Sequence, residues 1–355
     1  MSTGTFGLQL TRFRRTAQLA VARSGLEVAP EILDGTRAEL EVVTAQLAGI
    51  RDDDSRPDLR LASVLGLTPD QLDFLWAVVA RAADPMLGPI LALLSGSDAK
   101  RGLSVSHYAT IMGLDSARSQ DLATILSPAH PLLRHRFLVG PHDAPIDACT
   151  PLTVPPRVWS YLRGDDDVED QLAFAGGRVR VPHDAQFDAV QLTAIARLVQ
   201  AFGSIDPLVI VVEGPLGAGR RTAIAKAAAA ARRAVIAIDL GRIVATPRAL
   251  EEALAAQMRE CLLADAIPVI AEVDELIDAE GDRSQRLQTL ARALETAPGA
   301  IAVTSAIRGI DLGVRGRRVL RVEWPVPSTD ARRALWISAL GDDAARLESG
   351  VDEIA

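Results

Sequence analysis

The stretch that decides the fold is Gly214-Pro215-Leu216-Gly217-Ala218-Gly219-Arg220-Arg221-Thr222. It follows the apolar run 208–212 and opens the alanine-rich segment 223–234. An apolar run, a glycine loop and a good helix sequence in this order predict a strand, a tight turn and a helix. The backbone N–H groups of such a loop bind phosphate, and the helix dipole adds to the attraction. Residues 214–222 are therefore the predicted phosphate-binding residues.

The loop keeps the glycines of the G-x-x-x-x-G-K-[ST] motif but departs at its last two positions. Arg220 stands in place of the Lys, and Arg221 stands in place of the hydroxyl residue that ligates Mg²⁺. The only lysines are Lys100 and Lys226, so a general preference for Arg accounts for Arg220. It does not account for Arg221, because a guanidinium cannot ligate a cation. One alternative stays open: with a one-residue insertion in the loop, Thr222 would supply the hydroxyl.

An α/β alternation surrounds this loop. Apolar runs predict strands at 235–238, 267–271, 300–303 and 319–322, and helical spacing predicts helices at 187–202, 248–263 and 283–296. Near-continuous apolar strands separated by helices are typical of a parallel sheet covered on both faces. The fold class predicted for this half is α/β.

Four of these segments, in this order, resemble the AAA+ ATPase family. The glycine loop stands at its Walker A position, 267–276 looks like its Walker B strand, and 303–305 is similar to its sensor 1 strand end. Residues 324–327 followed by 332–336 look like the entry to its lid. The resemblance covers about 187–355, and it implies a P-loop NTPase fold with ATP or ADP as the cofactor.

The resemblance also implies roles for single residues. Glu272 aligns with the catalytic Walker B glutamate, and Ser305 takes the sensor 1 position, where Asn is usual. Arg317 fits best, among three nearby arginines, as an arginine finger that acts on a neighbour's nucleotide. The same alignment puts Ala271 where the family has its metal-binding Asp. A second register, with Glu272 inside the strand, would make Asp274 and Glu275 the Walker B pair.

Both protein ligands for Mg²⁺ are therefore missing from the direct alignment, at Arg221 and at Ala271. We expect the loop to bind nucleotide without hydrolysing it, and we predict no metal site. Two alternatives stay open: a tight strand–helix turn that binds no ligand, and an active ATPase that drives remodelling or assembly. Cys149 and Cys261 are isolated thiols without metal-ligand spacing, which is typical of reduced cysteines.

The N-terminal half predicts helices and a small mixed domain. We place two helices in 1–60 and a winged-helix-like domain in 61–165. Within that domain we expect helices at 105–112 and 117–126, strands at 132–139 and 152–154, and a helix at 157–162. Residues 166–186 are predicted as a linker, 187–327 as the large α/β subdomain, and 328–355 as the start of a truncated lid.

The charge of the chain indicates which class of partner it binds. A net charge of −8 argues against a chain-wide nucleic-acid footprint. The basic residues of the winged-helix-like domain are few, which favours protein docking over a DNA-binding switch; they are Arg118, His130, Arg134, His135 and Arg136. No apolar run approaches the roughly 20 residues that span a bilayer, so we expect a cytoplasmic protein without membrane contact.

The combination of helices, winged helix, acidic linker and degenerate loop resembles bacterial AAA ATPases with an N-terminal variant winged-helix domain. Some of these are encoded beside contractile injection systems, and a degenerate first AAA module can precede an intact second one. The resemblance implies a regulatory or assembly role. The implied partners are other AAA+ modules, downstream in the same chain or in an oligomer, and a protein bound by the winged helix. We expect the chain to be a fragment whose catalytic half lies downstream.

Overall fold

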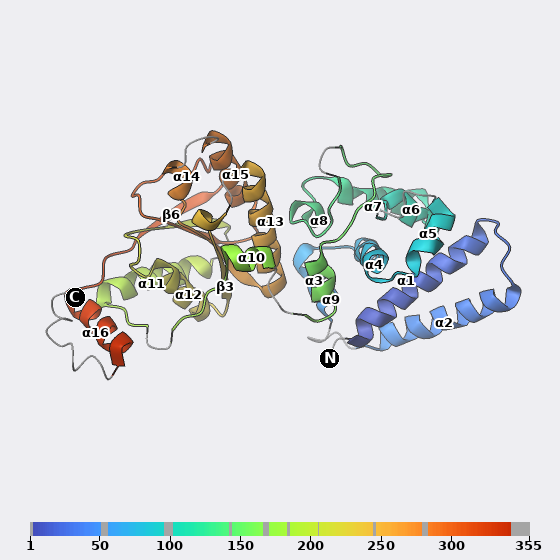
Figure 1. Cartoon of the computed structure of the whole chain (residues 1–355), viewed down its shortest axis with the longest axis horizontal. Helices are drawn as coiled ribbons and strands as arrows, with labels where there is room; N and C mark the ends of the chain where they lie inside the picture. The colour runs from blue at the N-terminus through green and yellow to red at the C-terminus, as the bar shows by residue number, and fades with distance from the viewer. Residues whose placement is uncertain are drawn as a thin grey trace. The chain divides into compact units, whose positions relative to one another are not determined.

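Figure 1 shows the computed structural model of the chain, which divides into two compact units, Met1–Asp167 and Val168–Ala355. Each unit is described by itself. The structure describes residues 3–50, 56–95, 102–141, 144–165, 170–182, 185–204, 206–243, 246–278 and 283–341. The acidic run of the predicted linker and the end of the predicted lid, 342–355, lie outside these ranges.

Unit 1 is built mainly of helices around α1 (Thr3–Arg23). Helix α1 packs against α2 (Pro30–Gly49), α4 (Pro69–Ala83), α5 (Leu87–Ser95) and α6 (Val105–Met112). The remaining helices are α3 (Pro57–Leu65), α7 (Ser116–Ala123), η2 (Thr124–Leu126), α8 (Pro131–Arg134) and α9 (Pro156–Leu162). The predicted helices at 105–112, 117–126 and 157–162 are thus confirmed, with the second ending in a turn of 3-10 helix.

Helix α4 shows why its sequence forms a buried helix. The Thr68 hydroxyl accepts a hydrogen bond from the Gln71 backbone N–H, and the Gln71 amide oxygen accepts one from the Thr68 N–H. This reciprocal cap satisfies two N–H groups that the helix leaves unpaired. Trp76, on the buried face of α4, donates its indole N–H to Asp58 over 3.3 Å.

The strand predicted at 132–139 is wrong. Pro131 occupies the first position of α8, where its missing N–H costs nothing, and His130 Nδ1 accepts from the Leu132 N–H as the N-terminal cap. Leu132 is buried on this short helix, and Phe137 and Leu138 are buried in the segment that follows it. Strand pairing in this region is limited, among the described residues, to two isolated bridges, Val139 with Thr153 and Leu103 with Leu152.

Unit 2 contains a six-stranded sheet in the order β1-β3-β4-β5-β2-β6. Five strands are parallel: β2 (Leu208–Glu213), β3 (Ala234–Asp239), β4 (Ala266–Ala271), β5 (Ile301–Ser305) and β6 (Arg318–Glu323). All five were predicted, to within two residues at each end. The sixth, β1 (Gly176–Arg178), pairs antiparallel with β3.

Strand β1 and the short helix α10 (Asp170–Ala175) lie in the segment predicted as a linker. A Cβ at Gly176 would lie 1.9 Å from the carbonyl oxygen of Ala237. Only glycine lets β1 approach β3 so closely. This part of the predicted linker therefore belongs to the sheet of unit 2.

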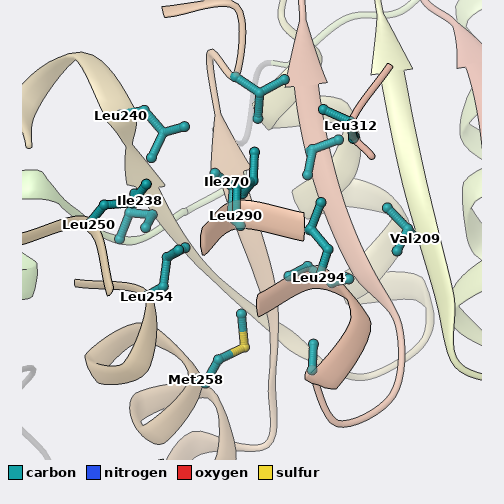
Figure 2. Close-up of a cluster of buried hydrophobic side chains, with 14 of the residues drawn as sticks. Val209, Ile238, Leu240, Leu250, Leu254, Met258, Ile270, Leu290, Leu294 and Leu312 are labelled. Atoms are coloured by element: carbon teal, nitrogen blue, oxygen red, sulfur yellow. The ribbon is translucent and has the colours of Figure 1, made fainter. Parts of the chain in front are cut away.

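Helices cover both faces of this sheet. One face packs on α13 (Pro247–Ala264) and α15 (Arg283–Thr296), and its core, drawn in Figure 2, includes Val209 and Ile270. The other face packs on α11 (Ala189–Phe202) and α12 (Arg220–Ala230), with Ile210 and Val212 pointing to it. Successive residues of β2 thus enter opposite cores, which explains why its sequence is apolar throughout.

Three short or peripheral elements complete unit 2: η3 (Leu240–Arg242), α14 (Glu275–Asp278) and α16 (Thr329–Leu340). No single helix in the described ranges is long and apolar enough to cross a membrane. The pair α4 and α5 reaches the required length and apolarity only when both members, bent by 118°, are counted together.

Candidate functional site

The glycine loop connects β2 to α12 at the carboxyl end of the strand, and each of its three glycines has a geometric reason. Gly217 and Gly219 have φ angles of 79° and 87°, a left-handed conformation that costs glycine little. Gly219 is also the N-cap of α12. A Cβ at Gly214 would lie 2.3 Å from the carbonyl oxygen of Trp324. The loop therefore has the strand–turn–helix geometry expected of a phosphate cradle.

The loop is fixed from two sides. The backbone N–H of Gly214 donates to the carbonyl of Ser305 at the end of β5 (3.0 Å), and the indole N–H of Trp324 donates to the carbonyl of Ala218 (2.7 Å). Phe187 packs edge-on against the Trp324 ring, with centroids 6.0 Å apart. Pro215, Leu216 and Gly217 stay exposed, so the outer turn of the loop is open to a ligand.

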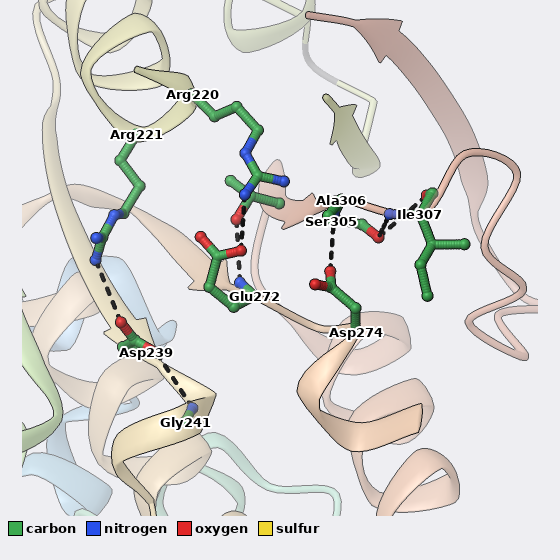
Figure 3. Close-up of polar contacts among 10 residues, drawn as sticks. Arg220, Arg221, Asp239, Gly241, Glu272, Asp274, Ser305, Ala306 and Ile307 are labelled. Carbon is green, nitrogen blue, oxygen red and sulfur yellow. Dashed lines mark hydrogen bonds and ion pairs between the residues drawn. The ribbon is translucent and has the colours of Figure 1, made fainter. Parts of the chain in front are cut away.

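Arg220, the first residue of α12, points inward. Its side chain is only 3% exposed, and its Nη2 lies 2.7 Å from Oε2 of Glu272 (Figure 3). Its Nη1 is buried without a hydrogen-bond partner among the described residues. The residue predicted at the motif Lys position thus forms an ion pair with the residue predicted at the catalytic Glu position.

Glu272 follows directly on β4, which ends at Ala271, so it lies outside the strand as the direct alignment requires. Its φ of 57° is unusual for a residue with a side chain and is often found at functional sites. The backbone N–H of Glu272 donates to the Thr304 hydroxyl over 3.0 Å. Burial raises the pKa of Glu272, and Asp274 raises it further, while the Arg220 guanidinium acts in the opposite direction.

Arg221 points away from this pair. Its guanidinium is half-exposed and lies 3.6 Å from a carboxylate oxygen of Asp239, at the end of β3 (Figure 3). Thr222, which follows in the first turn of α12, is half-buried. The structure thus brings two guanidinium groups to the start of α12, one buried and one accessible.

The remaining polar residues of the site hold the backbone. The Asp274 carboxylate accepts from the backbone N–H of Ala306 over 2.9 Å. The hydroxyl of Ser305, at the predicted sensor 1 position, is buried; it donates to the carbonyl of Ile307 (3.1 Å) and accepts from its N–H (3.0 Å). Both residues therefore stabilise the turn that follows β5.

The donor set fits a phosphate group and does not fit Mg²⁺. The glycine loop, the N-terminus of α12 and the Arg220 Nη1 all offer N–H donors, which phosphate oxygens accept. Mg²⁺ prefers carboxylate and hydroxyl oxygens, whereas the two ligand positions hold Arg221 and the buried Ala271. Nowhere in the described ranges do three His, Cys, Asp or Glu side chains gather as a metal site would require.

Arg317 is engaged within its own unit. Its guanidinium donates to the carbonyl oxygens of Leu294 (2.6 Å) in the last turn of α15 and of Ala297 (3.0 Å) and Gly299 just after that helix. Burial lowers the pKa of Arg317. A role as an arginine finger would require breaking these bonds, and it stays a prediction. The neighbouring Arg318 is 80% exposed and lies 3.6 Å from Asp206.

Two residues that sequence reasoning did not assign to the site also shape it. Trp324 was placed only at the entry to the lid, yet it bonds to the loop. Glu213, the last residue of β2, is buried, accepts from the Gly309 N–H over 3.1 Å and pairs with Arg321. A charged residue ending an otherwise apolar strand was the available signal for Glu213.

No protein-family model matches the chain, and no curated protein matches it. Among solved structures, a chain from a study of katanin self-assembly is similar at 17% identity and a TM-score of 0.32, over 44% of this chain and 57% of that one. A chain from the E. coli MS115-1 HORMA:CdnC:Trip13 complex is similar at 12% identity and a TM-score of 0.28, over 46% of this chain and 66% of that one. The chain thus spans less than two thirds of either protein. Likenesses this distant assign neither a family nor a function.

Proposed function

We propose that unit 2 is a degenerate AAA+-type module that binds ATP or ADP without hydrolysing it and acts in regulation or assembly. The observation that carries this proposal is the ion pair between Arg220 and Glu272, which joins the motif Lys position to the catalytic Glu position over 2.7 Å. The glycine loop beside it retains the geometry of a phosphate cradle.

Binding is supported by the charge and the shape of the loop. Its exposed turn leads into the N-terminus of α12, whose first N–H groups have no partner within the helix. Arg221, half-exposed at the same end, adds a positive charge within reach of a ligand. A polyphosphate is the ligand class that matches these donors.

The lack of hydrolysis follows from what phosphoryl transfer requires. A metal ion must neutralise the phosphates, and a free carboxylate must position the nucleophile. Arg221 and Ala271 cannot ligate the metal, so the lack of hydrolysis rests on the missing metal ligands. In the absence of nucleotide the Glu272 carboxylate is also engaged by Arg220. Nucleotide bound in this loop is therefore retained rather than consumed.

Calorimetric titration with ADP and ATP, in EDTA and in Mg²⁺, tests the proposal alongside a phosphate-release assay. We expect both nucleotides to bind in EDTA and no phosphate release above that of Arg220→Ala. Strong tightening by Mg²⁺ together with steady phosphate release would instead establish an active ATPase. Absence of any nucleotide binding would reject the proposal.

For unit 1 we propose a winged-helix-type docking role. Its support is the succession of α6, α7 and α9 with the bridges at Leu103 and Val139. Two of the five basic residues named above are already engaged or buried: Arg118 donates twice to the Asp70 carboxylate, and His135 is buried, which leaves few basic groups for a nucleic-acid backbone. Anisotropy of labelled duplex DNA tests this. We expect no binding, whereas affinity that falls steeply with salt would favour a DNA-binding switch.

We further propose that other AAA+ modules, in the same chain or in an oligomer, are the partners of unit 2. A module that binds nucleotide but does not hydrolyse it contributes by changing its contacts with such neighbours. Sedimentation velocity of the chain with and without ADP tests this. We expect a larger sedimentation coefficient with ADP, and an unchanged monomer under both conditions would argue against assembly through this site.

A further inference from the structure

Only one of the two terminal nitrogens of the Arg220 guanidinium has a hydrogen-bond partner among the described residues. Nη2 is held by Glu272, whereas Nη1 is buried and has no acceptor among the described residues. Figure 3 shows Nη1 directed away from the Glu272 carboxylate. A buried donor without an acceptor is unfavourable, so this nitrogen gains by meeting an anion. It belongs to the first residue of α12, directly after the glycine loop.

The Glu272 carboxylate would compete with such an anion for the Arg220 guanidinium. The charged groups that face it are Arg220 and Arg221 on α12 and Asp274 in the turn after β4. Arg221 is in turn drawn towards Asp239 on β3. Both arginines at the loop therefore rest against carboxylates of the protein itself, in the places where a phosphate ligand would compete for them.

We propose that Glu272 is an intramolecular competitor for Arg220, so that a polyphosphate without bound Mg²⁺ enters the loop by taking the guanidinium from Glu272. The inference rests on the proposed function, because it assumes that the loop accepts phosphate. The inference specifies that the ligand is a metal-free di- or triphosphate. It also specifies that binding is controlled by the exchange of the Glu272 carboxylate for a phosphate at Arg220. No bond is made or broken covalently.

The charges around the loop also determine whether Mg²⁺ strengthens or weakens the binding of a polyphosphate. The Mg²⁺ complex of a diphosphate carries less negative charge than the free diphosphate, and it offers fewer oxygens to guanidinium donors. Arg220 and Arg221 repel the cation, and the ligand positions of Ala271 and Arg221 offer it nothing. Mg²⁺ is therefore expected to weaken binding, which is the opposite of its usual effect at a nucleotide loop.

The test is a double-mutant cycle read by calorimetry with inorganic pyrophosphate and with ADP, in EDTA. The proteins are the full chain, Glu272→Gln, Arg220→Ala and the double variant. We expect Glu272→Gln to bind about tenfold tighter, because the lost competitor made a charge-assisted hydrogen bond. Arg220→Ala is expected to bind at least tenfold weaker, and the double variant to match it.

Two controls keep the cycle interpretable. Glu251→Gln removes one negative charge from an exposed position of α13 and should leave the affinity unchanged. Glu272→Gly removes the carboxylate at a backbone position whose φ of 57° suits glycine, so it serves if Glu272→Gln folds poorly. Circular dichroism of each variant confirms folding before titration.

The outcomes separate this inference from the proposed function. If the full chain binds both ligands and Glu272→Gln binds no tighter, the exchange is overturned while nucleotide binding stands. The same holds if the gain from Glu272→Gln persists in the Arg220→Ala background, because the carboxylate then acts by general repulsion. If Glu272→Gln binds the two ligands and the unsubstituted chain does not, the result supports Glu272 as a competitor for Arg220. It rejects the proposal that the unsubstituted chain binds nucleotide. If neither binds, both proposals fall.

Discussion

The indole N–H of Trp324 donates to the carbonyl oxygen of Ala218 over 2.7 Å, across 106 residues of sequence. Trp324 follows β6 and precedes the segment that leads to α16, whereas Ala218 lies inside the glycine loop. The backbone N–H of Trp324 also donates to Glu213, at the end of β2. The loop conformation thus depends on the segment that connects the sheet to α16.

Trp324→Phe should loosen the loop while keeping the aromatic packing on Phe187. We expect a loss of about 1 kcal/mol in the free energy of unfolding, the usual contribution of one hydrogen bond, and weaker ADP binding. Urea unfolding and calorimetry measure the two effects. Trp336→Phe, on the exposed surface of α16, is the matched control and should change neither.

Glycine substitutions should separate steric from conformational demands in the loop. Gly214→Ala forces a Cβ against the Trp324 carbonyl and should destabilise unit 2 by about 1–3 kcal/mol. Gly217→Ala meets no atom within 4 Å and should cost only the left-handed backbone, about 1–2 kcal/mol. Gly203→Ala, where the nearest atom is 3.5 Å away, is the control for thermal unfolding. Equal losses at Gly214 and Gly203 would contradict the close approach.

His135 should make unit 1 sensitive to acid. Burial lowers the pKa of His135 to about 4, so the folded state keeps the ring neutral while the unfolded state binds a proton below its ordinary pKa of 6.5. Its contribution to stability is therefore complete above pH 6.5 and is lost as the pH falls towards 4, by about 1.4 kcal/mol per pH unit.

Denaturant unfolding at pH 7 and pH 5 measures this effect. His135→Leu cannot titrate, so it should lose less stability than the unmodified chain between the two pH values. The carboxylates titrate in both proteins and cancel in the comparison. Identical pH dependence of the two proteins would show that the His135 ring is accessible to protons in the folded state.

Arg317 should prove important for stability. Arg317→Ala removes hydrogen bonds to the carbonyl oxygens at the end of α15, and we expect a loss of about 1–3 kcal/mol. Arg318→Ala, at an exposed neighbouring position, should change stability by less than about 0.5 kcal/mol. A stable Arg317→Ala chain that fails to support a partner's nucleotide turnover would instead establish the finger role.

The sequence predicted the parallel sheet well because both faces of each strand are buried. Short, continuous apolar runs such as 208–212 and 267–271 are typical of parallel strands that are buried on both faces. The strand at 132–139 failed because a proline and a capping histidine favoured a helical turn over an equally apolar strand. Strand β1 was missed because three residues with two glycines carry no strand signal and pair only through a close backbone approach.

The part of the candidate site that comes from one continuous stretch of sequence was predictable. The strand, loop and helix of 208–230 follow directly from one stretch of sequence. The pairing of Arg220 with Glu272, 52 positions apart, was not predictable. It depends on the sheet order, in which only β5 lies between β2 and β4, and on a left-handed backbone at Glu272 that the residue type does not predict.

Strand β1 has a practical consequence for producing unit 2 alone. A fragment that begins at residue 187, where the α/β sequence pattern begins, would remove β1 and strip β3 of its antiparallel neighbour. The uncovered edge of β3 would then offer unpaired N–H and C=O groups to other chains, a known cause of aggregation. A fragment meant to stay in solution should therefore start near residue 168, so that β1 remains paired with β3 and the exposed edge is a strand of only three residues.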